Sequence, residues 1–74
     1  MAARKTYWIQ YLEQRWKVRH NLQTLSTHVL KSDAVDAGVK VAKANQPSEL
    51  VICRQDGTIE DRRTYGDDPF PPQG

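Results

Sequence analysis

A single segment with helical periodicity lies between stretches that have strand character, and this arrangement most limits how the chain can fold. In residues 32–46 the small and apolar side chains recur at a spacing that gathers them on one side of a helix. Ser32 is the expected N-cap, and Pro47 is expected to end the helix. Gly38 lies on the apolar side and costs about 1 kcal/mol relative to alanine in a helix, so we expect a sheet to approach the helix backbone closely there. The residues on that side are Val35, Gly38, Val39 and Ala42, with Ala34 and Val41 at its edge.

Three stretches before this helix have strand character. Residues 6–12 are rich in aromatic and β-branched types, which favour a pleated surface. Residues 15–20 alternate strictly, which places three basic side chains on one face and Trp16 with Val18 on the other. Residues 24–29 give a weaker signal, and their threonine and valine content predicts a third short strand.

Two further strands are expected after the helix. Residues 49–54 form an apolar run, and an Asp-Gly pair at 56–57 gives a strong hairpin signal, so residues 58–65 should return beside the run. The pattern predicts an α+β fold, in which one helix packs on one face of an antiparallel sheet of four to five strands. We expect a single domain over residues 1–66. A proline-rich tail should follow over 67–74, because prolines lack the N–H donors of a strand ladder.

The register of the second hairpin stays open at this point. A two-residue loop would put Ile59 on the same face as Ile52, whereas a three-residue bulged loop would pair Ile59 with Cys53. The register of the first hairpin is also open.

The length of the chain argues against a large enclosed active site. With 74 residues it forms one small domain, and a domain of this size buries only about 60% of its unfolded surface. No apolar run approaches the ~18 residues that a membrane span needs, and residues 1–5 lack the apolar stretch of a signal peptide. We therefore expect a cytoplasmic protein. The single cysteine, Cys53, excludes an intramolecular disulfide and a multi-cysteine zinc site.

Side chains with catalytic or metal-binding chemistry are few and scattered. His20, His28 and Cys53 have no spacing that would place two of them on one metal ion. The paired carboxylates at 60–61 and 67–68 are neighbours on an extended chain and point to opposite faces. The sequence contains no glycine-rich phosphate loop. We expect no enzymatic activity, no catalytic residue, no metal ion and no cofactor.

The basic charge is concentrated in the first part of the chain. Residues 1–31 carry six basic side chains against one acidic side chain, whereas residues 32–74 carry five against eight. The three cations of the 15–20 strand share one face, where they could follow a phosphate backbone. Binding of nucleic acid is therefore the alternative function. Its expected residues are Arg4, Lys5, Arg15, Lys17 and Arg19.

The preferred function is protein binding, with homodimerisation as its simplest form. One helix covers only one face of a sheet, so surplus apolar side chains would form a patch that binds a partner. Tyrosine, tryptophan and arginine dominate the hot spots of protein interfaces. An edge strand beside the proline-rich tail could also pair with a second copy. The expected partner-binding residues are Trp8, Tyr11, Leu12, Arg15, Lys17, Arg19, Leu22 and Leu25.

Motifs along most of the chain resemble one family. Ser-Thr-His at 26–28 precedes the predicted helix, Pro-Ser-Glu-Leu-Val-Ile spans 47–52, and Asp-Gly-Thr-Ile spans 56–59. The longest motif, Thr-Tyr-Gly-Asp-Asp-Pro-Phe-Pro-Pro-Gln-Gly, spans 64–74. These motifs are similar to those of a small bacterial and phage-associated family of unknown function, the DUF2188-like proteins. The resemblance implies no established activity, cofactor or catalytic residue.

The chain departs from the family pattern mostly in its first half. Residues 13–15 stand where relatives have a glycine-rich turn, Leu30 stands where a threonine often caps the helix, and Cys53 stands where histidine often follows Val-Ile. The last change argues against a shared metal or catalytic role at that position. Drift would produce this pattern, and so would natural or engineered diversification of a binding surface over residues 8–30.

Overall fold

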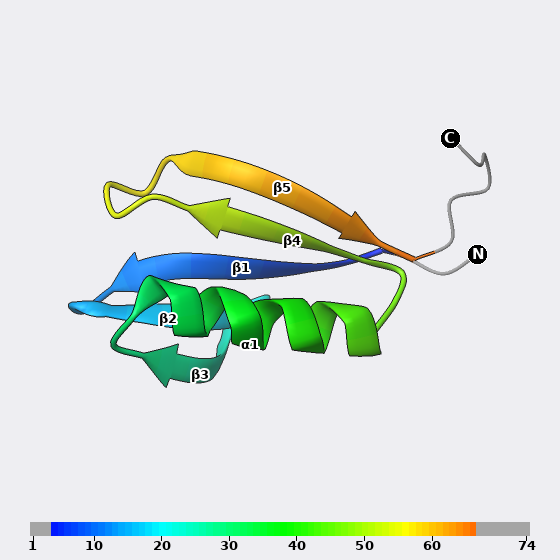
Figure 1. Ribbon diagram of the computed structural model, residues 1–74, viewed down its shortest axis with the longest axis horizontal. Coiled ribbons are helices and arrows are strands. Elements are labelled where there is room, and N and C mark those ends of the chain that lie inside the picture. The colour runs from blue at the N-terminus through cyan, green and yellow to red at the C-terminus, as the bar shows by residue number, and fades with distance from the viewer. Residues whose placement is uncertain (1–3, 67–74) are drawn as a thin grey trace.

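Residues 4–66 are described by the computed structural model, and over this range the chain forms five strands and one helix (Figure 1). The order of the elements confirms the predicted α+β fold and the third strand. The tail predicted over 67–74 lies outside the described residues. The elements are β1 (Lys5–Leu12), β2 (Arg15–His20), β3 (Gln23–His28), α1 (Lys31–Ala44), β4 (Ser48–Cys53) and β5 (Ile59–Tyr65).

The strands form a mixed sheet in the order β3-β2-β1-β4-β5. β2 is antiparallel to β1 and β3, and β4 is antiparallel to β5, but β1 and β4 run parallel at the centre. The expectation of a purely antiparallel sheet is therefore wrong for this pair. The reason is the crossover: β3 runs in the same direction as β1, and α1 returns the chain to the end where both begin, so β4 runs parallel to them.

The core lies between the sheet and α1, which packs on β1, β2, β3 and β4. Tyr7, Ile9 and Leu50 lie in this core and are at most 4% exposed. A Cβ atom built on Gly38 would lie 2.6 Å from Ile9 Cδ1 and 3.0 Å from Leu50 Cδ1. The predicted close approach of helix and sheet at this glycine is thereby confirmed. The other buried core side chains are Trp16, Val18, Ala34, Ala42 and Ile52.

Both ends of α1 differ slightly from the sequence prediction. The N-cap residue is Leu30, which makes no side-chain cap, and the predicted cap Ser32 lies inside the helix. At the other end, the backbone N–H of Asn45 donates to the carbonyl of Ala42 at 3.2 Å. The buried hydroxyl of Ser48 donates to the same carbonyl. These two bonds satisfy a helix-end acceptor and fix the start of β4 to the end of the helix.

The β4–β5 hairpin adopts the bulged register of the two that the sequence left open. Cys53 pairs with Ile59, and the ladder shifts next to this pair. In the turn, Asp56 Oδ1 accepts hydrogen bonds from Thr58 N and Oγ1 at 3.0 and 2.7 Å. These bonds hold the pKa of the Asp56 carboxyl below its usual range. Gly57 has a φ of 94°, which glycine adopts without steric cost.

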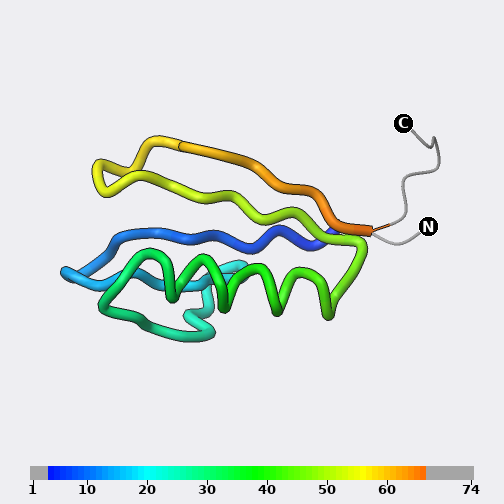
Figure 2. Tube along the Cα trace, in the orientation of Figure 1, coloured from blue at the N-terminus to red at the C-terminus, as the bar shows by residue number. Residues whose placement is uncertain are grey.

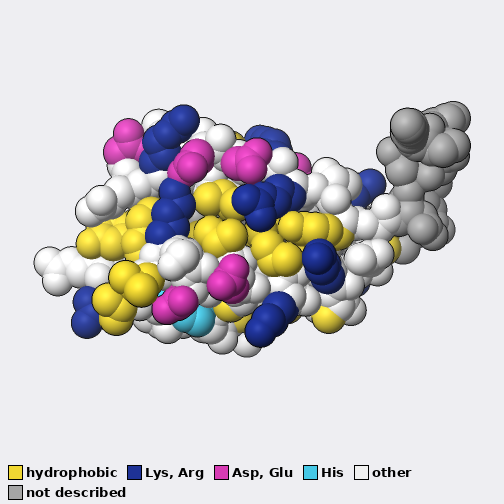
Figure 3. Space-filling view, in the orientation of Figure 1, with side chains coloured by type: hydrophobic (Ala, Val, Ile, Leu, Met, Phe, Trp, Pro, Cys, Tyr) yellow, Lys and Arg dark blue, Asp and Glu magenta, His cyan; other side chains and the backbone are white. Residues whose placement is uncertain are grey.

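The tips of the β1–β2 and β4–β5 hairpins lie at one end of the molecule, and the ends of the described chain lie at the other (Figure 2). On the helix side, a band of hydrophobic side chains runs along the molecule beside a row of charged side chains (Figure 3). No helix within residues 4–66 combines the length and apolar content that crossing a bilayer requires.

Candidate binding surface

The sheet face opposite α1 carries five of the eight residues that the sequence predicts for protein binding. Register brings them together, because Trp8 lies opposite Arg19 and Leu12 lies opposite Arg15 on the neighbouring strand. Their immediate neighbours along β1 and β2 contribute to the core, so strand alternation turns these side chains away from the helix. We call this surface the open face and define it by Trp8, Leu12, Arg15, Lys17 and Arg19.

A shallow groove of about 350 Å³ lies on the open face. It combines an apolar side chain, a hydroxyl group, two cations and a carboxylate. Trp8 adds an aromatic ring next to Arg19 across the strands. Arginine and tryptophan are enriched at protein interfaces, whereas lysine and glutamate are depleted there. The groove is lined by Leu12, Glu13, Lys17, Arg19 and Thr24.

The rim of the groove contains an ion pair that sequence reasoning missed. Lys17 Nζ lies 2.7 Å from Glu13 Oε1, and 16% of the Lys17 side chain is exposed. The hydrogen bond and the charge of Lys17 lower the pKa of the Glu13 carboxyl. Glu13 and Gln14 make the β1–β2 turn with φ values of 55° and 64°. The turn therefore positions the one acidic side chain of residues 1–31 against the basic strand.

The two arginines of the open face donate to carbonyl groups of the adjoining turns. Arg15 Nη1 donates to the carbonyl of Gln14 at 2.9 Å. Arg19 Nη2 donates to the carbonyl of Leu22 at 3.1 Å, whereas its buried Nε has no partner within the described residues. These bonds hold both guanidinium groups in place at the two ends of β2, so their positions are set before any partner binds.

Two side chains of β4 are buried on the side of the sheet away from the helix. Val51 and Cys53 are 0% and 2% exposed, although they alternate with the core residues Leu50 and Ile52. Val51 is the parallel neighbour of Trp8, so a small second apolar cluster lies on this side of the sheet. The unbroken apolar run from 50 to 53 was the available signal, because such runs are typical of strands buried on both faces. Burial raises the pKa of the Cys53 thiol, which disfavours the reactive thiolate.

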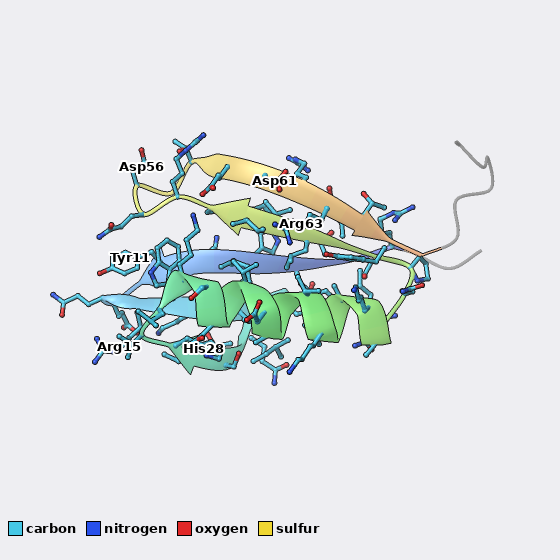
Figure 4. The ribbon with its side chains drawn as sticks, in the orientation of Figure 1. Tyr11, Arg15, His28, Asp56, Asp61 and Arg63 are labelled. Carbon is cyan, nitrogen blue, oxygen red and sulfur yellow. The ribbon has the colours of Figure 1, made fainter. Side chains whose placement is uncertain are left out.

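Three other predicted partner-binding residues lie elsewhere. Tyr11 packs on the helix side, with its ring centroid 4.9 Å from that of Trp16. Leu22 is 91% exposed in the turn between β2 and β3. Leu25 is 41% exposed on β3, where the ladder with β2 is irregular. In Figure 4, Tyr11 and Arg15 both lie near the end of the molecule that carries the hairpin tips.

Arg4 and Lys5 are not brought together with the other cations. Lys5 alternates with the core residues Tyr7 and Ile9, so it lies on the helix face of β1 and not on the open face. Arg4 Nη1 instead donates to the carbonyl of Ser48 at 3.3 Å. The basic side chains expected to contact nucleic acid therefore form two separate groups.

Each of the two histidines lies against another side chain of the sheet. The His28 Nε2 atom lies 2.9 Å from Ser26 Oγ, and the His20 ring centroid lies 4.8 Å from that of Tyr7. Within residues 4–66, no group of three or more histidine, cysteine, aspartate or glutamate residues could hold a metal ion. The open face, with its groove, remains the candidate functional site.

Fold and surface together define a small α+β domain in which α1 covers one face of a mixed sheet and no described helix covers the opposite face. The chain belongs to the DUF2188 family, described as uncharacterized proteins conserved in bacteria, which it matches over residues 7–65. The match runs from β1 to the last residue of β5 and confirms the resemblance carried by the motifs. No curated protein and no solved structure matches the chain.

Proposed function

We propose that the chain is a non-catalytic protein-binding module that acts in the bacterial cytoplasm through its open face. The groove next to Trp8 carries the proposal, because it places Leu12 and Arg19 on one accessible surface. Tryptophan and arginine are frequent interface anchors, and truncating such an anchor typically costs about 2 kcal/mol or more. Three cations against the single carboxylate of Glu13 favour a partner segment with acidic side chains.

Nucleic acid is the alternative partner, and the geometry supports it less well. Phosphate binding by a strand face requires several cations that are free to neutralise phosphates, which releases the counterions condensed on the nucleic acid. Lys17 is already paired with Glu13, and Arg15 and Arg19 donate to carbonyl groups of the chain. The cations before β2 do not extend this row, because Lys5 lies on the helix face of β1 and Arg4 donates to the carbonyl of Ser48.

Site-specific photo-crosslinking in bacterial cells tests the open face. A benzoylphenylalanine placed at Leu12, which is 36% exposed at the groove, should give a discrete protein adduct. The same probe at Asp36, an exposed residue of α1, is the matched control and should not give that adduct. Arg19→Glu should remove the Leu12 adduct by reversing a charge in the groove. The same adduct at both positions, or an adduct that survives Arg19→Glu, would contradict the proposal.

A titration with a mixed-sequence DNA oligonucleotide separates the two classes of partner. Electrostatic binding to nucleic acid weakens steeply between salt concentrations of about 50 and 300 mM. We expect no comigration of protein and DNA in size-exclusion chromatography at either concentration. Comigration at low salt alone would support nucleic-acid binding and contradict the proposal, provided that it is lost when Lys17 and Arg19 are replaced by glutamine.

A further inference from the structure

The two edges of the sheet differ in their protection against pairing with another strand. Within the described residues these edges are β3 and β5. β5 carries four consecutive charged side chains, and charge is a common means of blocking an edge. β3 has neither a charged residue nor a proline, and each edge strand carries one bulge, at Leu25 in β3 and at Glu60 in β5. In Figure 1, no described element lies beyond the outer side of β3. The charged residues of β5 are Glu60, Asp61, Arg62 and Arg63.

Both ends of β3 carry the most exposed large apolar side chains within residues 4–66. Leu22, just before the strand, is 91% exposed, and Val29 and Leu30, just after it, are 70% and 57% exposed. None of the three contributes to the core. Leu30 also occupies the N-cap position of α1, where it makes no side-chain cap. Folding of a single chain therefore gives no reason for apolar residues at these positions.

We propose that β3 pairs antiparallel with β3 of a second copy, about a two-fold axis, to extend the sheet across a homodimer. Antiparallel pairing places the start of one strand beside the end of the other. Leu22 of each copy would then lie next to Val29 and Leu30 of the other, so six exposed apolar side chains would be covered at once. Because the strand is uncharged, its own copy brings no like-charge repulsion along the ladder.

This inference rests on the proposed protein-binding function and names one partner, but it uses a different surface from the open face. The pairing replaces the earlier expectation that the edge beside the proline-rich tail associates, since that edge is β5. The open face stays accessible in such a dimer. A two-fold axis perpendicular to the sheet keeps both helices on one side and both open faces on the other.

Sedimentation velocity over a range of protein concentrations tests the dimer. The wild-type chain should shift from monomer to dimer, whereas Leu22→Glu should raise the dissociation constant by about 100-fold, because a buried leucine is lost twice per dimer. Thr64→Glu adds the same charge to the exposed β5 edge and is the matched control, which should dimerise as the wild type does. Leu22 is 91% exposed, so its replacement should leave the fold of the monomer unchanged, as circular dichroism would verify.

Amide hydrogen exchange locates the interface independently of any variant. Protection of amides in β3 should rise with protein concentration in the wild type, and this rise should be absent in Leu22→Glu. A chain that is monomeric at every concentration overturns the inference. A dimer that Leu22→Glu leaves intact also overturns it, as does a dimer that Thr64→Glu weakens as much as Leu22→Glu does. None of these results affects the Leu12 crosslink, so a failure of the dimer and a failure of the open face are distinguishable.

Discussion

At the scale of single residues, the β1–β2 turn is the clearest site of local strain. A residue other than glycine in the left-handed region costs about 1–2 kcal/mol, and Gln14 lies there with a φ of 64°. Glycine avoids this cost but loses about 0.5–1 kcal/mol of chain entropy on folding. We therefore expect Gln14→Gly to raise the free energy of unfolding by about 0.5–1 kcal/mol, as measured by urea denaturation.

Gln14→Ala is the control for this prediction. Alanine meets the same steric cost as glutamine at positive φ, so it should give no comparable gain in stability. The carbonyl of Gln14 that accepts from Arg15 is a backbone group and is present in all three chains. A glycine variant that is no more stable than the alanine variant would show that the turn is unstrained.

The pKa of Glu13 gives a second test at this scale. Lys17 lowers that pKa, so the ion pair stabilises the folded state above the pKa of the unfolded chain. The stabilisation is lost as the pH falls through the lowered pKa of the folded state. In Lys17→Met, the Glu13 pKa measured by carbon-13 NMR should rise toward its ordinary value. Lys43→Met, which removes an exposed cation from α1, should leave it unchanged. If the Glu13 pKa were the same in Lys17→Met and the wild type, the ion pair with Lys17 would not be the cause of the lowered pKa.

At the scale of elements, the contact between α1 and the sheet limits what position 38 can hold. Glycine to alanine in an exposed helix stabilises by about 1 kcal/mol. A methyl group on Gly38 would instead meet Ile9 Cδ1 at 2.6 Å, and overpacking a core costs about 1–3 kcal/mol. We expect Gly38→Ala to lower the free energy of unfolding by about 1 kcal/mol, as measured by denaturant unfolding.

A double-mutant cycle identifies the cause of this loss. Ile9→Val removes the Cδ1 atom that the new methyl group would meet, so Gly38→Ala should cost at least about 0.5 kcal/mol less in that background. Additive effects of the two substitutions would show that the crowding is elsewhere. Leu50 Cδ1, at 3.0 Å from the same position, would then be the next atom to test.

The sequence predicted some elements better than others, and the reason is local. β2 has the predicted bounds of 15–20, because its basic and apolar residues alternate without interruption. The predicted third strand exists, but as Gln23–His28 rather than 24–29, since threonine and serine mark strands and turns alike. The cap of α1 was misplaced at Ser32 because its type fits a cap, whereas the chain enters the helix through Leu30.

At the scale of the whole molecule, the strand order depends on contacts that no local pattern records. The parallel β1–β4 pair follows from the path of the crossover, and the sequence showed two hairpins without showing how they join. The sequence left open which side chains of β1 share a face with the cations of β2, because the register of this hairpin was open; the register puts Trp8 and Leu12 there. Glu13 and Thr24 were missed as groove residues, because the groove depends on how β1, β2 and β3 come together.

The parallel β1–β4 pair also determines when the sheet can be completed during synthesis at the ribosome. The turns that join β1 to β2 and β2 to β3 are short, so these strands can pair as soon as they emerge. Ile9 of β1, in contrast, can pair only after its β4 neighbour Ile52 has been synthesised, forty-three residues later. At about 5–20 residues per second, the side of β1 that pairs with β4 stays unpaired for about 2–9 s. During that interval the nascent chain displays an apolar strand that only its own later half can cover.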